Sequence, residues 1–384
     1  MVYIYYFFFK KYKRKQLNKI TLVQILRSPE GGIRKHVVDI LENLSREHYD
    51  MVFITDRTTE DRDLNYLSTK HSVGFYDLKI IDRPGFRDIV NIVKIAFFLI
   101  GKKNMILHGH GAKGGLYARV CSLFLKCKSV YTPHGGSLHR VFGATKAFIF
   151  DSVEKLLVPF TDLFIFESQY SRGEFQKYIC NCSDKSIVNY NGVVFPQSSS
   201  RKYYAAGDEI NIASFGLLRK LKGHDIVIEA LALLKKKNIP FKYTIYGYGE
   251  EKENLLNQIK ESDLNHSVKI RDFCSDILEE MKKYHLIIHP SRFESFGYVP
   301  VEAMSVKVPV LTSFEGGLKE VAQEPLITKT NTPFDYEKFL EGIYNGSYNL
   351  EKIALESFEE AKNKFSISLM IKVLDSSYRK LVKH

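Results

Sequence analysis

Short apolar segments rich in β-branched residues alternate with longer segments of helical periodicity from about residue 20 to the end of the chain. The segment 35–45 shows the helical pattern, because Val37, Ile40 and Leu44 fall on one face. Parallel strands buried on both faces have the composition of the short segments, and helices cover such sheets. The alternation therefore predicts an α/β fold. The expected strands are 21–26, 51–55, 105–108, 129–132, 162–166, 186–189, 210–215, 243–247, 267–270, 285–290 and 308–312.

The alternation is interrupted once, near the middle of the chain. Residues 196–209 (PQSSSRKYYAAGDE) are polar and rich in turn-forming residues, and a new strand begins at Ile210. A chain of 384 residues is long enough for two domains that each bury a core. We therefore expect a first domain over 20–195, a linker over 196–209 and a second domain from residue 210, each a doubly wound Rossmann-like sheet.

Ligands of doubly wound sheets bind in the loops that follow the carboxyl ends of the strands. The most informative of these loops reads SRFESFGYVPVEAM (291–304). Pro300 suits the first turn of a helix, so Glu294 belongs to the loop and Glu302 to the helix. Gly297 lets a ligand approach the backbone, and the N-terminus of the helix attracts phosphate. The alternative interpretation is a pair of ordinary acids, one on a solvated loop and one at a helix start.

A basic loop follows the first strand of the second domain. The sequence GLLRKLKG (216–223) carries Arg219, Lys220 and Lys222 between two glycines and leads into a helix. Arginine offers a fork of donors to phosphate oxygens and lysine a point charge. Such a loop can stabilise the negative charge that develops on a departing diphosphate. A solvated basic loop is the alternative.

Glycines also follow two further strands of the second domain. The loop YGYGE (246–250) contains Gly247, and the loop FEGGLKE (314–320) precedes another helix. A GxG pattern alone is weak evidence. Four loops of this kind after four strands nevertheless predict a pocket for a nucleotide diphosphate.

The first domain has glycine-rich segments after three of its expected strands. These are PEGGIRKH, in which Gly31 and Gly32 allow close approach of a ligand, HGHGAKGG and TPHGG. Histidines in the last two raise the question of a metal site. We expect none, because neither a helical histidine pair nor an acid-rich loop completes a ligand set. His134 is expected to make polar contacts in a cleft between the domains, whereas His108 is either a site residue or a buried, hydrogen-bonded strand residue.

Two groups of residues with known chemistry elsewhere are not interpreted as sites. Asp61-Arg62-Asp63 forms a DxD, a spacing that can hold a metal with a sugar nucleotide, but no apolar strand leads into it and we expect a surface loop. The five cysteines form no CxxC pair and are odd in number, which favours free thiols in a reducing cytoplasm.

The chain carries a formal charge of +12, which indicates an anionic partner. Half of this excess lies in the first 20 residues, where an aromatic run precedes a basic one. The apolar run is too short to span a membrane, and a secretory signal has its charges first. The extension 1–19 is therefore either a peripheral anchor on anionic lipid or an untranslated or disordered leader. The other basic residues do not form an aromatic-interleaved stripe, so nucleic acid is not expected.

The segments quoted above, together with FESQYSR and YNGV, occur in the order seen in the retaining glycosyltransferases of family four, which the chain resembles from about Ile20 to about Glu324. The most specific part is Glu294-x7-Glu302 with PS before it and EAM after it. The resemblance implies the GT-B fold, in which two Rossmann-like domains face each other across a cleft. It also implies that the second domain ends near residue 365 and that the last helix, 366–384, packs back on the first domain.

The resemblance implies roles for the acidic loop. Glu294 and the backbone of Ser295, Phe296 and Gly297 would contact the transferred sugar and its phosphate. Glu302 would hold the ribose hydroxyls of the donor.

Further roles follow from the same resemblance. Lys222 and an arginine of the 216–223 loop would bind the diphosphate, with Gly216 and Gly247 beside the nucleotide. The chain departs from the family pattern here, because Leu217 stands where an arginine is common, and Arg219 is the expected substitute.

His134 would lie by the reacting sugar, and the loop with Gly31 and Gly32 would close over the donor phosphate and the acceptor. Hinge closure about 196–209 would exclude water and bring Arg219 and Lys222 onto the leaving group. Retention without a protein nucleophile implies a same-face substitution in which the departing phosphate takes the proton of the acceptor. No metal is needed in this scheme, because cations and helix N-termini supply the positive charge.

The function expected from the sequence is transfer of a hexose-type sugar from a nucleotide diphosphate sugar to a hydroxyl of a growing surface glycan, typically lipid-linked. UDP is favoured over GDP, no cofactor is expected, and the protein is expected to be a cytoplasmic monomer, peripheral on the membrane where the extension binds anionic lipid. The alternatives are a nucleotide-sugar epimerase or hydrolase on the same fold and an inactive peripheral scaffold. Glu294, Lys222 and Glu302 together argue against the scaffold.

Overall fold

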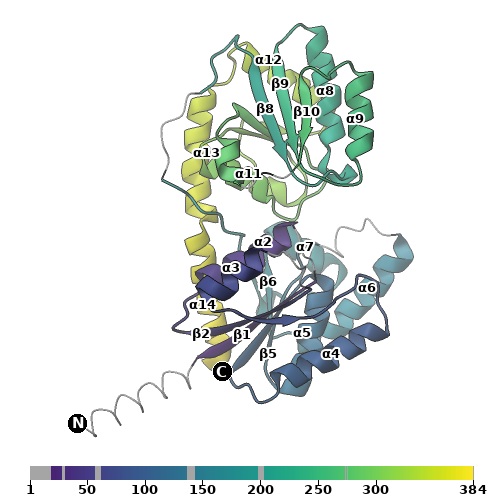
Figure 1. Cartoon of the computed structure of the whole chain (residues 1–384), viewed down its shortest axis with the longest axis vertical. Helices are drawn as coiled ribbons and strands as arrows, with labels where there is room; N and C mark the ends of the chain where they lie inside the picture. Colours follow the sequence, from purple (N-terminus) through teal and green to yellow (C-terminus); the bar gives the residue numbers. More distant parts are fainter. Residues whose placement is uncertain are drawn as a thin grey trace, which may run out of the picture. The chain divides into compact units, whose positions relative to one another are not determined.

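The computed structural model describes residues 19–27, 31–56, 62–135, 143–197, 203–272, 274 and 276–383. They form two compact units. One comprises the chain up to Gly192 together with the residues from Ser368 onward, and the other runs from Val193 to Ile367. Each unit is a parallel sheet covered by helices (Figure 1), which confirms the predicted α/β fold class with two Rossmann-like units.

The first unit contains a parallel sheet whose described strands are ordered β3-β2-β1-β4-β5-β6-β7. Its centre is apolar on both faces, because Val23, Ile25 and Leu107 are buried on one face and Leu22 and Ile106 on the other. The strands are β1 (Ile20–Leu26), β2 (Tyr49–Thr55), β3 (Gly74–Asp77), β4 (Met105–His110), β5 (Lys128–Thr132), β6 (Leu163–Phe166) and β7 (Ser186–Val188). The helices are α2 (Gly31–Asn43), α3 (Arg62–His71), α4 (Phe86–Leu99), α5 (Gly111–Leu125), α6 (Ala144–Leu157), α7 (Gln169–Tyr178) and α14 (Ile367–Lys383).

The last helix, α14, packs on the sheet of the first unit. The hydroxyl of Tyr49 on β2 donates to Oδ1 of Asp375 at 2.9 Å, and the hydroxyl of Tyr378 lies 2.7 Å from Nδ1 of His108 on β4. Tyr378 is fully buried in this contact. The chain therefore returns to its first unit after completing the second (Figure 1, yellow helix).

The second unit contains a parallel sheet with the described order β10-β9-β8-β11-β12-β13. The buried side chains of α8 and α12 pack on one core with those of β8 and β9. The strands are β8 (Ile210–Phe215), β9 (Phe241–Tyr246), β10 (Val268–Arg271), β11 (Leu286–His289), β12 (Val310–Ser313) and β13 (Ile327–Thr328). The helices are α8 (His224–Lys236), α9 (Lys252–Glu261), α10 (Ile277–Met281), α11 (Tyr298–Ser305), α12 (Pro333–Tyr344) and α13 (Leu350–Phe365), with short 3-10 turns η3 (Lys220–Lys222) and η4 (Gly316–Glu320).

Some segments expected to be loops belong to regular elements. Gly31 and Gly32 open α2, and Gly31 has a φ of 82°. In HGHGAKGG the strand β4 runs on to His110 and α5 begins at Gly111, so this segment contains no loop. Asp61 and the extension up to residue 18 lie outside the described residues, whereas residues 62–63 begin α3 and are not part of a loop. No helix among the described residues is long and apolar enough to cross a membrane.

Candidate functional site

In the second unit, the acidic loop connects β11 to α11. Glu294 lies in this loop and Glu302 in α11, as the position of Pro300 predicts. Gly297 has a φ of 101°, a conformation that favours glycine, and a Cβ there would lie 2.5 Å from the side chain of Leu318. Glu302 is only 5 % exposed, so the helix holds this carboxylate in a protected position.

The carboxylate of Glu294 is held by three neighbours. Its Oε1 forms an ion pair with the ammonium of Lys222, at the end of η3. Nε2 of His289 donates to the same oxygen at 3.0 Å, and the hydroxyl of Ser291 donates to it at 2.9 Å. Burial acts to raise the pKa of Glu294, but the charge of Lys222 and the bond from His289 outweigh it and hold this pKa well below its usual range. The loop therefore presents a fixed anion paired with a fixed cation.

The three cations of the 216–223 loop differ in what their side chains contact. Lys220 binds Asp225 at 2.7 Å, and the guanidinium of Arg292 binds both oxygens of Asp225 at 2.7 and 2.8 Å. Burial opposes ionisation of Asp225, but Arg292 and Lys220 lower its pKa to about 2. The side chain of Arg219 is exposed. Lys222 is thus the member of this loop that reaches Glu294, and Lys220 belongs to a separate structural ion cluster.

Glycines bring the loops of the second unit into direct backbone contact. A Cβ on Gly317 would lie 2.0 Å from the carbonyl oxygen of Ser295, and the N–H of Gly317 donates to the carbonyl of Glu294 at 2.7 Å. A Cβ on Gly247 would lie 1.9 Å from the carbonyl oxygen of Gly216. These two glycines serve loop-to-loop packing, which fixes the backbone next to Glu294 and Lys222.

Phe296 is anchored in the core of the second unit. Its side chain is 2 % exposed and its ring centroid lies 5.4 Å from that of Phe365. The side chain of Phe296 therefore packs within this unit and is not available to a ligand.

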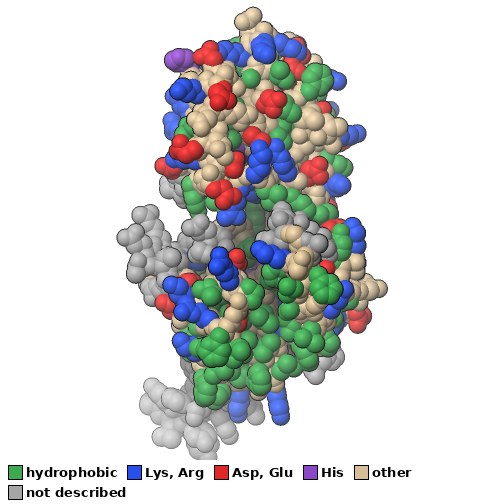
Figure 2. Space-filling view, turned by 90° about the vertical axis from the view of Figure 1, so that its right-hand side faces the viewer, with side chains coloured by type: hydrophobic (Ala, Val, Ile, Leu, Met, Phe, Trp, Pro, Cys, Tyr) green, Lys and Arg blue, Asp and Glu red, His purple; other side chains and the backbone are tan. Residues whose placement is uncertain are grey.

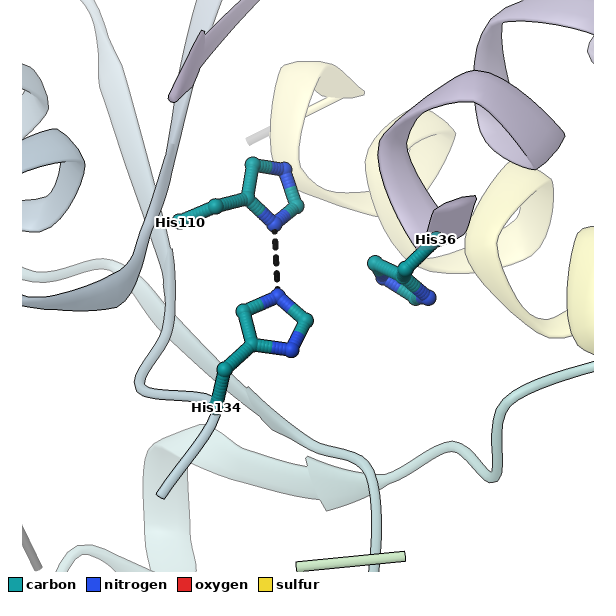
Figure 3. Close-up of side chains that lie close together, drawn as sticks. All are labelled: His36, His110 and His134. Atoms are coloured by element: carbon teal, nitrogen blue, oxygen red, sulfur yellow. Dashed lines mark hydrogen bonds between the residues drawn. The ribbon is translucent and has the colours of Figure 1, made fainter. Parts of the chain in front are cut away.

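In the first unit, three histidines from different elements meet (Figure 3). Nε2 of His110 on β4 donates to Oε1 of Gln24 at 2.6 Å, which leaves Nδ1 to accept from Nε2 of His134 at 3.0 Å. His36 on α2 approaches the pair, with its ring centroid 5.0 Å from that of His134. His134 follows β5 with a φ of 53° and lies 3.7 Å from the carboxylate of Glu167.

Burial keeps these imidazoles neutral. It lowers the pKa of His110 and of His134 well below the ordinary value, and it lowers the pKa of His36 to about 4. A neutral ring donates through one nitrogen and accepts through the other, as His110 does with Gln24 and His134. His108 is a buried strand residue bonded to Tyr378 and, at 2.9 Å, to Thr132, which confirms the structural one of its two interpretations.

The same three histidines are the one group within the described ranges that could hold a metal ion, since their ligand atoms lie within 4.8 Å of one another. Neutral imidazole is a ligand for zinc and related ions. In this structure, however, the Nδ1 lone pair of His110 is used by His134, so a metal would have to replace that hydrogen bond.

Sequence reasoning missed several of these residues. His36, Gln24, His289 and Ser291 were not singled out. His289 and Ser291 flank the proline of HLIIHPS just before the acidic loop. Polar residues at the end of a strand are the sequence pattern that could have identified them as site residues. His36 and Gln24 carry no local signal, because only the packing of α2 against β1 and β4 brings them to His110.

The order of these loops matches two family models that together span most of the chain. Residues 30–194 match the model described as Glycosyltransferase Family 4, and residues 197–341 match Glycosyl transferases group 1. The chain belongs to the family 4-like GT-B glycosyltransferases. In this glycosyltransferase the acidic loop and the basic loop both fall within the group 1 match.

Several curated relatives are similar to this glycosyltransferase. An uncharacterised glycosyltransferase of Methanocaldococcus jannaschii is 27 % identical over 91 % of this chain and 94 % of the relative. The O-antigen biosynthesis glycosyltransferase WclY of Escherichia coli is 27 % identical over 55 % of this chain and 62 % of its own length. The capsular polysaccharide biosynthesis glycosyltransferase CapM of Staphylococcus aureus is 23 % identical over 78 % of this chain and 82 % of its own.

Solved structures agree on the fold of this glycosyltransferase. Anabaena HepE in complex with UDP and glucose has a TM-score of 0.78 at 19 % identity and covers 93 % of this chain and 98 % of its own. A glycosyltransferase from Rickettsia africae has a TM-score of 0.78 at 18 % identity, covering 96 % and 100 % of the two chains.

Proposed function

We propose that this glycosyltransferase transfers a hexose-type sugar from a UDP-sugar to a hydroxyl of a growing, lipid-linked surface glycan, with retention of configuration and without a metal. The observation that carries the proposal is the Lys222–Glu294 ion pair, whose acid lies in the loop that leads into α11 with its buried Glu302. The similarity to WclY and CapM supports a surface polysaccharide as the product. The fold shared with the UDP complex of HepE supports UDP over GDP.

In this proposal, Lys222 and the exposed Arg219 bind the diphosphate, beside Gly216 and Gly247. Glu302 binds the ribose hydroxyls. The backbone of Ser295 and Gly297 and the carboxylate of Glu294 contact the sugar and its phosphate.

The reaction requires charge stabilisation more than proton transfer by the protein. The bond between C1 of the sugar and the phosphate oxygen breaks, and negative charge develops on the diphosphate next to Lys222. The acceptor oxygen bonds to C1 from the same face, and its proton passes to the departing phosphate oxygen. His134 lies by the sugar in this scheme and, being neutral, donates or accepts a hydrogen bond without adding charge. Gly31 and Gly32, at the start of α2, approach the donor phosphate and acceptor.

The proposal also assigns a place in the cell. A nucleotide sugar and a lipid-linked acceptor meet at the cytoplasmic face of the membrane, so the proposed enzyme works at the periphery of this face. The proposal takes it to be a monomer. The domain limits predicted from the sequence, with a hinge over 196–209, belong to the same proposal.

The test is a transfer assay with a panel of UDP- and GDP-sugars, long-chain alkyl glycosides as acceptors and proton NMR of the product. We expect a product whose anomeric coupling matches that of the donor, made from a UDP-sugar. An inverted product would contradict the retaining mechanism. Release of free sugar at the same rate with and without acceptor would instead identify a hydrolase.

A further inference from the structure

Helix α4 is apolar on its exposed face as well as on its buried face, where Ile95 and Leu99 pack in the core. Asp88 and Asn91 are buried, where Asp88 binds Lys113 at 2.6 Å and Asn91 binds the hydroxyl of Tyr117 at 3.2 Å. The outward stripe is apolar instead, with Phe86 77 % exposed and Phe97 71 % exposed. Together the exposed apolar residues of α4 and its end are Phe86, Ile89, Val93, Phe97 and Ile100. A helix that only covered a core would carry polar side chains along this outward stripe.

The neighbouring helices extend this apolar stripe. Contacts from Lys113 tie α5 to α4, and the buried pair of Arg119 and Glu154, 2.8 Å apart, ties α5 to α6. The exposed apolar residues of these two helices are Leu123, Phe124, Phe148, Ile149, Val153 and Leu156. Figure 2 shows hydrophobic side chains gathered on this face of the first unit. We call the exposed apolar residues of α4, α5 and α6 the α4–α6 patch; gatherings of this kind are rare on surfaces that face only water.

The surroundings of the α4–α6 patch are cationic. The exposed basic residues in 83–103, 123–128 and 143–160 are Arg83, Arg87, Lys94, Lys102, Lys103, Lys126, Lys146 and Lys155. The acids that the structure describes in these three ranges are buried (Asp88 and Glu154) or partly buried (Asp151). Within these three ranges the exposed charge that the structure describes is therefore positive, and the nearest exposed acid in the chain, Asp82, pairs with Arg27 at 3.5 Å.

A shallow pocket collects part of this charge. Four lysines line it at the carboxyl ends of α4 and α5, beside the apolar Leu125: Lys102, Lys103, Lys126 and Lys128. Asp162 lines it as well and pairs with Lys128 at 3.4 Å, which leaves an excess of positive charge. Ammonium groups around a concave surface can receive a phosphate group, and the apolar side chains next to it can enter acyl chains.

We propose that the α4–α6 patch docks the first unit onto a lipid bilayer with anionic headgroups. Aromatic and aliphatic side chains in the interface, bordered by lysines and arginines at headgroup level, are the pattern of a peripheral membrane surface. A second copy docked patch to patch would require acidic groups opposite these cations, and the described residues of the patch present none at their exposed positions. This surface is separate from the extension 1–19, and it binds lipid without donor or acceptor.

The test is sedimentation of the full chain with vesicles of phosphatidylcholine alone or with 30 % phosphatidylglycerol, without nucleotide. We expect binding to the anionic vesicles at least tenfold stronger than to the neutral ones, falling as salt is raised. The double variant Phe97→Ser/Phe148→Ser and the double variant Lys102→Glu/Lys126→Glu should each weaken binding at least tenfold. In a chain that lacks residues 1–16, each double variant should weaken vesicle binding by the same factor as in the full chain. This loss adds to any loss that the truncation itself causes.

The matched controls lie in the second unit. Phe334→Ser, at a side chain 65 % exposed, and Lys269→Glu, on an exposed position of β10, should bind as the wild type does. Thermal melts confirm that each variant is folded. Equal binding by patch and control variants would overturn the proposal, as would failure of the wild type to bind anionic vesicles. Conversion of a dimer to a monomer by the patch variants, with vesicle binding unchanged, would overturn it in favour of self-association.

Discussion

The ammonium of Lys222 and the carboxylate of Glu294 form an ion pair between two loops that are 72 residues apart in the chain. His289 and Ser291 bind the same carboxylate oxygen, so the pair is fixed before any ligand arrives. A site of this kind does not need to reorganise when charge develops on a leaving group, which is the condition for electrostatic catalysis. The predictions below follow from this relationship and from the buried groups around it.

Replacement of Lys222 by alanine should lower kcat/KM for sugar transfer about 100-fold or more, because a positive charge beside the departing diphosphate is lost. Glu294→Gln should have an effect of the same order while the protein stays folded. Steady-state kinetics with saturating acceptor measure both. The control is Lys235→Ala, which removes an exposed lysine paired with Asp263 and should leave the rate unchanged. Rates equal to the control in both site variants would refute the assignment.

Gly317→Ala should damage the site without touching a charged group. Its Cβ would lie 2.0 Å from the carbonyl oxygen of Ser295, so the backbone after Glu294 must move. We expect a loss of about 1–3 kcal/mol in stability and a fall in activity that is larger than the loss of folded protein explains. Gly173→Ala in α7 is the matched control, since nothing lies within 4 Å of its Cβ position. Wild-type kinetics in Gly317→Ala would show that the loop contact is unimportant.

Stability should fall as the pH falls through the range of the buried histidines. Burial lowers the pKa of His36 to about 4 from 6.5, so the folded state binds fewer protons than the unfolded chain. The stabilisation is complete above pH 6.5 and is lost as the pH falls from 6.5 through 4, a change of roughly 3 kcal/mol for this group. Urea midpoints at pH 7.5 and 4.5 should differ less in His36→Gln than in wild type. His266→Gln, at an exposed position, should retain the wild-type difference.

Chelators should leave transfer unchanged. The histidines His36, His110 and His134 could hold a metal ion, yet the proposed mechanism uses Lys222 and Arg219 for the charge of the leaving group. The rate in excess EDTA should equal the rate after addition of zinc or magnesium, and elemental analysis should find no metal bound in stoichiometric amount. A rate that collapses in EDTA and returns with one metal would assign these histidines a metal-dependent role.

The fold could be predicted from the sequence because buried parallel strands are continuous apolar runs. The strand 210–215 was placed with its observed limits, and α11 begins at Tyr298, which puts Pro300 in its first turn as expected. The strand β3 (Gly74–Asp77) was missed, since an edge strand with exposed residues lacks such a run. The segment HGHGAKGG was misjudged as a loop because glycine is a poor helix former. Its glycines allow contact instead: a Cβ on Gly114 would lie 2.2 Å from the carbonyl oxygen of Ile25.

The site was predictable only in part. Glu294, Glu302 and Lys222 stand out because charged residues follow strands at glycine-rich turns. Their partners do not, because the bond from His289 to Glu294 and the meeting of His36 with His110 depend on how loops and helices pack. Lys220 pairs with Asp225 and Lys222 with Glu294, although both are lysines of one short loop. The sequence does not distinguish them, because their partners are set by the fold of the loop.

The central claim is that the second unit binds a nucleotide diphosphate through Lys222. Calorimetric titration of UDP and of GDP into the wild type and into Lys222→Ala tests it most directly. We predict that UDP binds the wild type more tightly than GDP does, that a ligand at 100 times its Kd stabilises the fold by about 2.7 kcal/mol, and that Lys222→Ala weakens UDP binding at least tenfold. Equal affinity of the wild type and Lys222→Ala for UDP, or no binding of either nucleotide, would contradict the account.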